Sequence, residues 1–108
     1  MAGKKKTKRP STAKGPGIKV PSGWRVDRGG KSMSLDIETK DFLEAVNLIN
    51  AIAPIAEEIE HHPDFHLERW NHLRITTYSH DVGKLTERDA RLAERISAFL
   101  ARAPIRCR

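Results

Sequence analysis

Alternating apolar and polar residues predict a β-hairpin near the start of the chain. The alternation covers residues 24–26, breaks at Gly29-Gly30, and resumes over residues 33–37 with Met, Leu and Ile at every second position. Successive side chains of a strand point to opposite faces, and paired glycines favour a turn. This segment therefore predicts two strands with a shared apolar face, and we expect Trp24 to pack in the core or at the hairpin edge.

A different period predicts one long amphipathic helix from about Thr39 to Glu60. Apolar residues recur there at three- and four-residue steps, which places them on one helix face. They are Phe42, Ala45, Val46, Ile49, Ile52, Ile55 or Ala56, and Ile59. Thr39 is the expected N-cap, and the helix ends before Pro63, which cannot extend it. The stripe is wide enough to contact both a sheet and a partner helix, with Ile49 and Ile52 in its outward part.

The strand-like alternation returns in residues 65–70 and 73–79, which predict a second hairpin with Asn71-His72 as its turn. In the second of these strands the residues that face the helices are Leu73, Ile75, Thr77 and Ser79. The residues of the opposite, polar face are Arg74, Thr76, Tyr78 and His80. His80 therefore stands at the end of a strand, where a cleft could form.

A capping-box pattern at residues 86–89, Thr-Glu-Arg-Asp, predicts the start of a second helix. The apolar residues that follow at helical spacing are Leu92, Ile96, Phe99 and Leu100. Asp89 therefore has a capping role that needs no chemistry. That role is compatible with a second one, orienting the loop that follows His80.

The predicted order of elements is ββαββα, an α+β domain whose four-stranded antiparallel sheet carries two main helices on one face. The chain has 108 residues, enough for one small domain that would gain stability from oligomerisation. We place the domain at residues 23–103, between an N-terminal tail of residues 1–22 and a C-terminal tail of residues 104–108.

The positive charge of the chain belongs to its N-terminal tail. Residues 1–20 carry seven Lys and Arg and no acid, so the formal net charge of +6 leaves −1 for the other 88 residues. The tail is rich in Pro, Gly, Ser and Thr and contains little that could be buried, which predicts disorder. It either keeps the chain in solution or binds an acidic protein. The near-neutral domain has no nucleic-acid-binding motif, so we do not expect a nucleic-acid partner.

The single cysteine, Cys107, allows no disulfide within the chain and indicates a reducing compartment. The N-terminal residues are charged, but no apolar stretch follows them. We therefore expect neither a signal peptide nor a membrane span. These features predict a cytoplasmic protein.

All five histidines lie between Glu57 and Asp89. His61 and His62 end the first predicted helix and His80 ends a predicted strand, so three imidazoles could meet in one site. Imidazole is the side chain best suited to moving protons near neutral pH, whereas histidines in a chance arrangement are solvated at the surface. The remaining two, His66 and His72, fit no such position and are expected to be solvated.

Two other chemistries compete with acid–base catalysis. Three neutral imidazoles can bind zinc, but the adjacent His61 and His62 point in different directions unless the backbone bends sharply. Helical zinc pairs usually stand four residues apart. No Ser, Cys or Lys has the local context of an activated nucleophile, and no glycine-rich phosphate loop is present. Acid–base chemistry without a metal is therefore the favoured prediction.

The spacing of these residues resembles the signature of pterin-4a-carbinolamine dehydratases. The residues that carry the resemblance are Glu57, His61, His62, Pro63, Trp70, His80 and Asp89. It extends from Gly23-Trp24 to about Leu100. Members of that family usually open with a short amphipathic helix before the Gly-Trp pair, and this N-terminal helix is absent from the sequence.

The resemblance implies removal of water from a pterin 4a-carbinolamine to give quinonoid dihydropterin, with the pterin as substrate and no cofactor. An acid protonates the 4a-hydroxyl, and a base takes a proton from the neighbouring ring nitrogen. The residues implied as catalytic are His61, His62 and His80. Those implied around the pterin are Glu60, Tyr78, Ser79 and Asp81, and the supporting residues are Glu57, Pro63, Trp70 and Asp89. We favour His62 and His80 as the proton-handling pair, and the sequence leaves open which is acid and which is base.

The resemblance also bears on partners. The family pairs its sheets edge to edge and packs the long helices together, which implies a homodimer or homotetramer. Dehydratase-like proteins without the first helix include non-catalytic assembly helpers, some associated with carboxysomal RuBisCO. A second hypothesis is therefore an assembly factor or chaperone that binds an acidic partner such as RuBisCO through the basic tail, in association with the carboxysome. Retention of the three histidines and Asp89 favours the dehydratase. A third hypothesis, a transcriptional coactivator like animal members, requires a dedicated partner.

Overall fold

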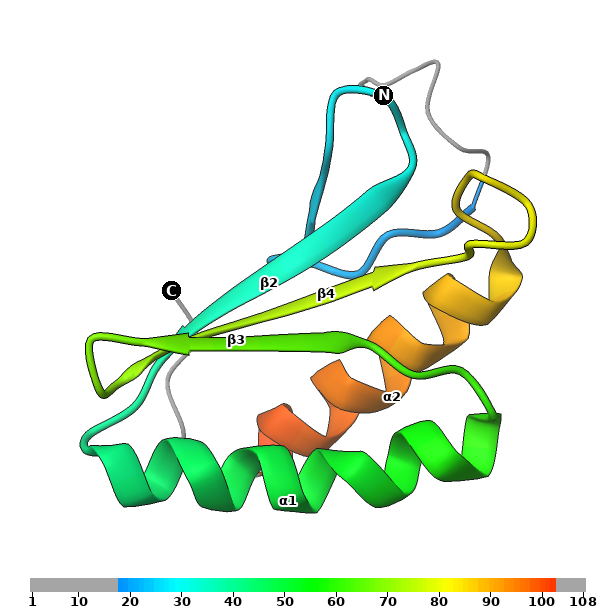
Figure 1. Ribbon diagram of the computed structural model, residues 1–108. Helices are drawn as coiled ribbons and strands as arrows, with labels where there is room; N and C mark the ends of the chain where they lie inside the picture. Colours follow the sequence, from blue (N-terminus) through cyan, green and yellow to red (C-terminus); the bar gives the residue numbers. More distant parts are fainter. Residues whose placement is uncertain (1–17, 103–108) are drawn as a thin grey trace, which may run out of the picture.

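The computed structural model describes residues 18–102, and its elements follow the predicted order ββαββα (Figure 1). The strands are β1 (Arg25–Val26), β2 (Ser32–Glu38), β3 (Asp64–Glu68) and β4 (His72–Tyr78), and the helices are α1 (Phe42–Ile59) and α2 (Glu87–Arg102). All strand pairs are antiparallel, and the sheet order is β1-β2-β4-β3. The predicted α+β fold is confirmed.

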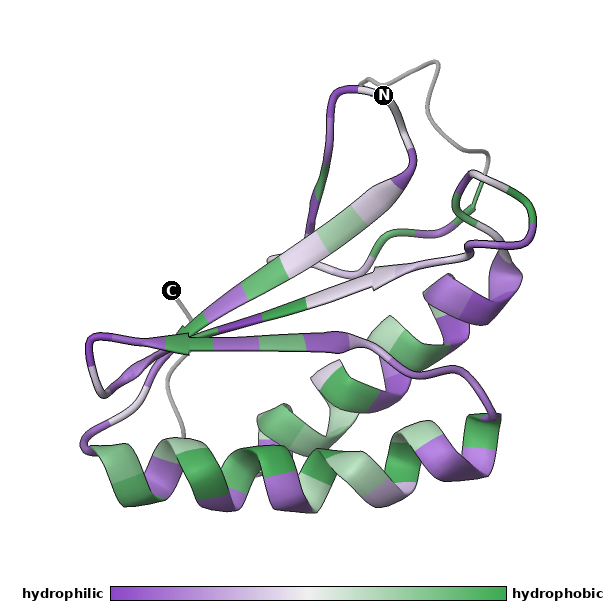
Figure 2. Ribbon diagram, viewed as in Figure 1, coloured by the Kyte–Doolittle hydropathy of each residue, from purple (hydrophilic) through white to green (hydrophobic). Residues whose placement is uncertain are grey.

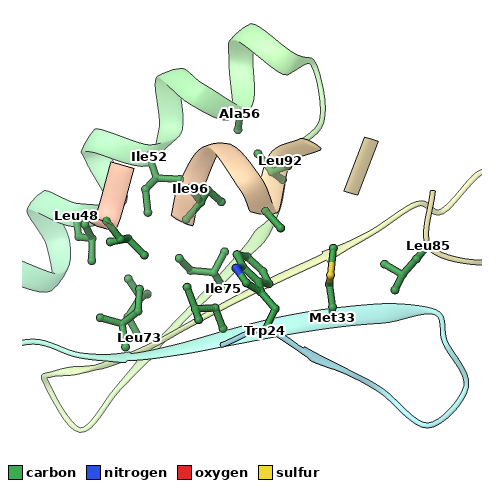
Figure 3. Close-up of a cluster of buried hydrophobic side chains, with 14 residues drawn as sticks. Trp24, Met33, Leu48, Ile52, Ala56, Leu73, Ile75, Leu85, Leu92 and Ile96 are labelled. Atoms are coloured by element: carbon green, nitrogen blue, oxygen red, sulfur yellow. The ribbon is translucent and has the colours of Figure 1, made fainter. Parts of the chain in front are cut away.

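The hydrophobic core lies between one face of the sheet and both helices. Figure 3 shows side chains of α1 and α2 directed toward those of the sheet, among them Leu48, Ile52, Leu92 and Ile96 opposite Leu73 and Ile75. The polar residues of the helices lie on other faces, as the hydropathy colours of Figure 2 show. Trp24 belongs to this core, and its indole N–H donates to Ser97 Oγ at 2.8 Å. This bond ties the chain at β1 to α2.

The inward face of β4 carries polar as well as apolar residues. Leu73 and Ile75 are buried in the core, and so are Thr77 and, directly after the strand, Ser79. The predicted division of the two faces is confirmed. Because side chains of both helices cover this face of the sheet, two hydroxyl groups are left inside the molecule, where each needs a hydrogen-bond partner.

Helix α1 has Asp41 rather than Thr39 as its N-cap. The Asp41 carboxylate accepts the Glu44 N–H at 2.8 Å, as in other N-capped helices. Thr39 is instead tied to the β3–β4 turn, because its N–H donates to the Asn71 carbonyl oxygen at 2.9 Å. The prediction of Thr39 as N-cap was wrong because this pairing joins residues that are distant in the sequence.

The β3–β4 turn covers residues 69–71 rather than Asn71-His72. His72 is already the first residue of β4, where it faces Glu68. Arg69 and Trp70 have φ values of 50° and 55°, in the left-handed region that suits tight hairpin turns. The predicted turn was wrong because left-handed turns are signalled by Gly, Asn or Asp, and neither residue is of these types.

The outward part of α1 also differs from the prediction. Ile52 is 0% exposed, and Ile49 is half-buried against the core. The large apolar residues that α1 exposes are Phe42 and Leu43, at 54% and 64%. The apolar stripe is therefore used mainly by the chain's own core, and the exposed apolar surface of α1 lies in its first turn.

The packed chain begins before the predicted domain boundary at residue 23. Ile18 and Val20 are half-buried against the core. Within the described residues no helix precedes β1, while residues 1–17 of the predicted tail and residues 103–108 lie outside the described part of the chain. Neither helix found in residues 18–102 is both long and apolar enough to cross a membrane.

The outward face of the sheet carries an ion-pair network centred on Asp36 in β2. The Asp36 carboxylate accepts hydrogen bonds from His72 Nε2 at 3.0 Å, from Arg74 Nε at 2.9 Å and from Arg25. Burial alone would raise the pKa of Asp36, but the three hydrogen bonds lower it to about 2. The prediction that His72 is solvated was wrong, since its side chain is held in this network and is only 20% exposed.

Replacing Asp36 with asparagine should remove a pH-dependent part of the free energy of unfolding. Folding lowers the pKa of Asp36, so its contribution is present above the unfolded value of about 4 and is lost as the pH falls through about 2. We expect a contribution on the order of 1 kcal/mol, because Arg25 and Arg74 are largely exposed to solvent. Urea unfolding should show a smaller loss of stability between pH 7 and pH 2 in Asp36→Asn than in the wild type.

The control for this experiment is Glu58→Gln, which removes an exposed ion pair with Arg95. It should change the free energy of unfolding at pH 7 by less than about 0.5 kcal/mol. An identical acid-induced loss in the wild type and in Asp36→Asn would contradict the assignment of this pH dependence to Asp36.

Candidate active site

Asp89 is a fully buried carboxylate that joins three elements of the fold. Its Oδ1 contacts His61 Nε2 at 2.6 Å and accepts the Thr77 hydroxyl at 2.5 Å. Its Oδ2 accepts the Ser79 hydroxyl at 2.7 Å and the Thr86 N–H at 3.0 Å. One side chain therefore connects the turn after α1, the end of β4 and the start of α2.

The start of α2 explains why Asp89 lies there. Thr86 precedes the helix, its Oγ1 accepts the Arg88 N–H at 3.2 Å, and its N–H donates to Asp89. The Thr86 hydroxyl therefore caps one N–H of the first turn and the Asp89 carboxylate caps the Thr86 N–H, as the acidic residue of a capping box does, so the predicted capping role of Asp89 is confirmed. The amphipathic pattern of α2 turns its first turn toward β4, which brings the carboxylate beneath the sheet.

The end of α1 sets the two adjacent histidines apart. The backbone of Glu60 is in the left-handed helical conformation, with φ 63° and ψ 37°. The N–H of the next residue, His61, donates to the Ala56 carbonyl oxygen at 3.1 Å. This turn ends the helix in the way that left-handed residues commonly do. His61 is consequently buried while His62 is exposed, as expected for neighbouring side chains that point in different directions.

The hydrogen bonds of Asp89 determine which ring nitrogen of His61 carries a proton. Burial alone would raise the pKa of Asp89, but the bonds from Thr77, Ser79, the Thr86 N–H and His61 together lower it below its usual value. An ionised carboxylate only accepts hydrogen bonds, so His61 Nε2 must be the donor. Nδ1 has no hydrogen bond among the described residues, so it is the ring nitrogen of His61 whose hydrogen-bonding capacity is unused.

The hydroxyl groups around Asp89 form an ordered chain. Ser79 gives its only hydroxyl proton to Asp89, so in its 2.9 Å contact with Thr86 the Ser79 oxygen must accept. Thr86 thus donates its hydroxyl proton to Ser79 and accepts from the Arg88 N–H. Each buried hydroxyl has a partner, which is the condition for burying polar groups at low cost.

His62 lies at the surface, paired with another motif residue. Its Nε2 is 2.7 Å from Glu57 Oε2, and both side chains are more than half exposed. Glu57 lies in the last turn of α1, and Pro63 follows His62 in the loop to β3. This pair is accessible to solvent and to a bound molecule.

His80 is also exposed, directly after the buried Ser79. Its ring packs edge-on against Tyr78, with centroids 4.4 Å apart and an interplanar angle of 80°. Burial, the charge of Asp64 and a hydrogen bond to it raise the pKa of Tyr78. In the next loop a hydrogen bond from Arg88, at 2.8 Å, lowers the pKa of Asp81. The segment 78–81 therefore presents an aromatic ring, an imidazole and a carboxylate.

Most, but not all, of the motif residues lie at this end of the molecule. His61, Ser79 and Asp89 are joined by hydrogen bonds, and His62 and His80 are their chain neighbours. Trp70 lies instead in the β3–β4 turn, 63% exposed, before the first residue of β4. Since β4 has seven residues, Trp70 is on the order of 20 Å from the site, and it does not contribute to it directly.

The sequence reasoning missed two residues of this network. Thr77 was assigned only to the inward face of β4 and Thr86 only to a helix cap, yet both contact Asp89. The sequence did contain a sign of this network, because Thr77 and Ser79 stand at consecutive inward positions of one predicted strand. Buried hydroxyl groups require buried hydrogen-bond partners. Within residues 18–102 no three or more His, Cys, Asp or Glu side chains are grouped so that they could hold a metal ion.

Comparison with protein families adds to this geometry. The family model described as Pterin 4 alpha carbinolamine dehydratase matches residues 9–99 of the chain. A relative from Arabidopsis thaliana, pterin-4-alpha-carbinolamine dehydratase 2, mitochondrial, is 35% identical over 78 residues, which cover 70% of this chain and 42% of that protein. The chain thus spans less than half the length of this relative.

Two solved structures are similar in fold. A transcriptional coactivator/pterin dehydratase from Brucella melitensis has a TM-score of 0.64 and 27% identity, covering 71% of this chain and 81% of its own. A pterin dehydratase-like protein identified as a RuBisCO assembly factor in the alpha-carboxysome has a TM-score of 0.60, covering 75% of this chain and 93% of its own. At 17% identity, this second likeness shows a common fold and no more.

Proposed function

Because this chain belongs to the pterin 4α-carbinolamine dehydratase family, we propose that it removes water from a pterin 4a-carbinolamine by acid–base chemistry. The observation that carries the proposal is the buried His61–Asp89 contact of 2.6 Å, with exposed histidines at the next position in the chain and after Ser79. Dehydration needs an acid for the departing 4a-hydroxyl and a base for the neighbouring ring N–H. The product is quinonoid dihydropterin, and no cofactor is required.

We assign the proton transfers to His62 and His80. Both are exposed, so each can exchange protons with water between turnovers. Their surroundings differ, since His62 contacts the Glu57 carboxylate and His80 contacts the Tyr78 ring. The proposed reaction needs one of these imidazoles as the acid and the other as the base. The buried His61 is held by Asp89, and its Nδ1 accepts a hydrogen bond from the pterin.

The residues that resemblance implies around the pterin divide into two groups. Glu60, Tyr78 and Asp81 reach the surface beside the histidines and contact the substrate in this proposal. The Ser79 hydroxyl is buried and donates to Asp89, so Ser79 supports the site without touching the pterin through its side chain.

His61→Ala, His62→Ala and His80→Ala should each lower the dehydration rate, by about 10²-fold if one acid–base contribution is lost. The substrate is a 4a-hydroxytetrahydropterin, and the measured quantity is the rate in excess of the uncatalysed dehydration. His66→Ala is the matched control, because His66 is an exposed histidine of β3 whose Nε2 hydrogen-bonds Glu68, and it should leave the rate unchanged. Wild-type rates in all three site variants would refute the assigned roles.

The alternative is a catalytically weak or inactive assembly factor or chaperone that binds an acidic protein such as carboxysomal RuBisCO through the basic residues of the tail. One fold can serve both tasks, so the site and not the fold must decide. The seven basic residues among the first twenty favour this alternative. The dehydratase proposal is wrong if the wild type shows no excess rate while deletion of residues 1–17 abolishes binding to purified RuBisCO.

We also propose that the chain forms a homodimer or homotetramer, supported by the exposed Phe42 and Leu43 in the first turn of α1. Leu43→Glu should shift the wild-type species toward the monomer in sedimentation velocity at micromolar concentration, because a charge would be buried in the contact. Ala98→Glu, on an exposed position of α2, is the control and should sediment as the wild type does. A monomeric wild type would contradict the proposal.

A further inference from the structure

Thr77 is a polar residue at a position where packing alone would favour an apolar one. It lies on the inward face of β4, faces Met33 across the sheet, and is fully buried. The preceding inward residues of the strand, Leu73 and Ile75, are apolar. A buried hydroxyl costs free energy unless it is hydrogen-bonded, and valine has nearly the same shape without that cost. The hydroxyl of Thr77 therefore has a task other than filling space.

That hydroxyl is directed at one oxygen of Asp89. Thr77 Oγ1 donates to Oδ1 at 2.5 Å, and His61 Nε2 lies 2.6 Å from the same oxygen. The other oxygen, Oδ2, is held by the Ser79 hydroxyl and the Thr86 N–H. With donors fixed on both oxygens, the carboxylate cannot rotate without breaking a hydrogen bond. Oδ1 consequently stays aimed at the His61 ring.

We propose that Thr77 is a positioning residue whose hydroxyl keeps the Asp89 carboxylate aimed at His61. The same hydrogen bond favours the ionised carboxylate, so the contact between Asp89 and His61 persists to lower pH. The consequence of this role for catalysis rests on the proposed function, whereas the effect of the Thr77 hydroxyl on Asp89 does not. Thr77 itself is buried and touches no substrate in this account. It acts only through Asp89.

The surroundings of Asp89 contain few other groups that could control its ionisation. Among the described residues His61, from the turn after α1, is the titratable side chain in contact with it. β4 contributes the Thr77 hydroxyl, the residue after β4 contributes the Ser79 hydroxyl, and the chain before α2 contributes Thr86. Arg88, next in the chain, is exposed and bonded to Asp81. Burial would raise the pKa of Asp89, and the Thr77 bond stands first among those that lower it.

The test is a carboxyl ¹³C NMR titration of Asp89 in the wild type and in Thr77→Val. Removal of one hydrogen bond to a charged group should raise the titration midpoint by about one pH unit, and the acid limb of the dehydration rate should move with it. Thr77→Ser restores the hydroxyl and should return both to near the wild-type values. Thr76→Val is the matched control, since the Thr76 hydroxyl contacts Ser34 on the outward face at 2.8 Å, and it should leave the midpoint unchanged.

The outcomes separate this inference from the proposed function. An absence of turnover in the wild type would refute the dehydratase, whereas an unshifted Asp89 midpoint in Thr77→Val would refute the role of Thr77. Equal shifts in Thr77→Val and Thr76→Val would also overturn it, because they would indicate general loosening of β4. If Thr77→Val does not fold, a measurement on the wild-type protein tests the role of Thr77 instead. Its Thr77 hydroxyl proton should be protected from exchange and visible by NMR at low temperature, and rapid exchange of that proton would overturn the proposal.

Discussion

A carboxylate can remain ionised inside a protein only when hydrogen-bond donors surround its oxygens, and much of this molecule is arranged so that Asp89 meets that condition. The donors come from the turn after α1, from β4 and from the first residue before α2. Each of these elements thereby acquires a fixed end. The constraint is reciprocal, because loss of the carboxylate would leave two hydroxyls, a backbone N–H and an imidazole buried without their partner.

The same carboxylate links stability to chemistry. As the cap of α2 it stabilises a helix, and as the acceptor for His61 it fixes the proton on Nε2. Of the two exposed histidines, His62 follows His61 in the chain and His80 follows Ser79, which also binds Asp89. The three histidines thus have different neighbours: His61 contacts a buried carboxylate, His62 contacts an exposed carboxylate, and His80 packs against an aromatic ring. Acid–base elimination of water needs such a difference between otherwise identical side chains.

The sequence predicted the fold and part of the site, because both depend on short-range patterns. Period-two and period-3.6 alternation identified the strands and helices, and the Thr-x-x-Asp pattern identified the cap at Asp89. The errors concern contacts between distant residues. Thr39 was assigned as a cap although it pairs with Asn71, and His72 was assigned to solvent although it binds Asp36. His61 and Thr77 stand 28 and 12 residues from Asp89, so no local rule could show that all three share one hydrogen-bond network.

The most direct test of the central claim is a double-mutant cycle between His61 and Asp89, measured by urea unfolding at pH 7. The His61→Gln and Asp89→Asn variants and their combination should give a coupling energy of at least about 1 kcal/mol, as expected for residues that share a buried network. The parallel cycle on the exposed pair His62 and Glu57 should give less than about 0.5 kcal/mol. A coupling energy for His61 and Asp89 no larger than that of the exposed pair would contradict the account.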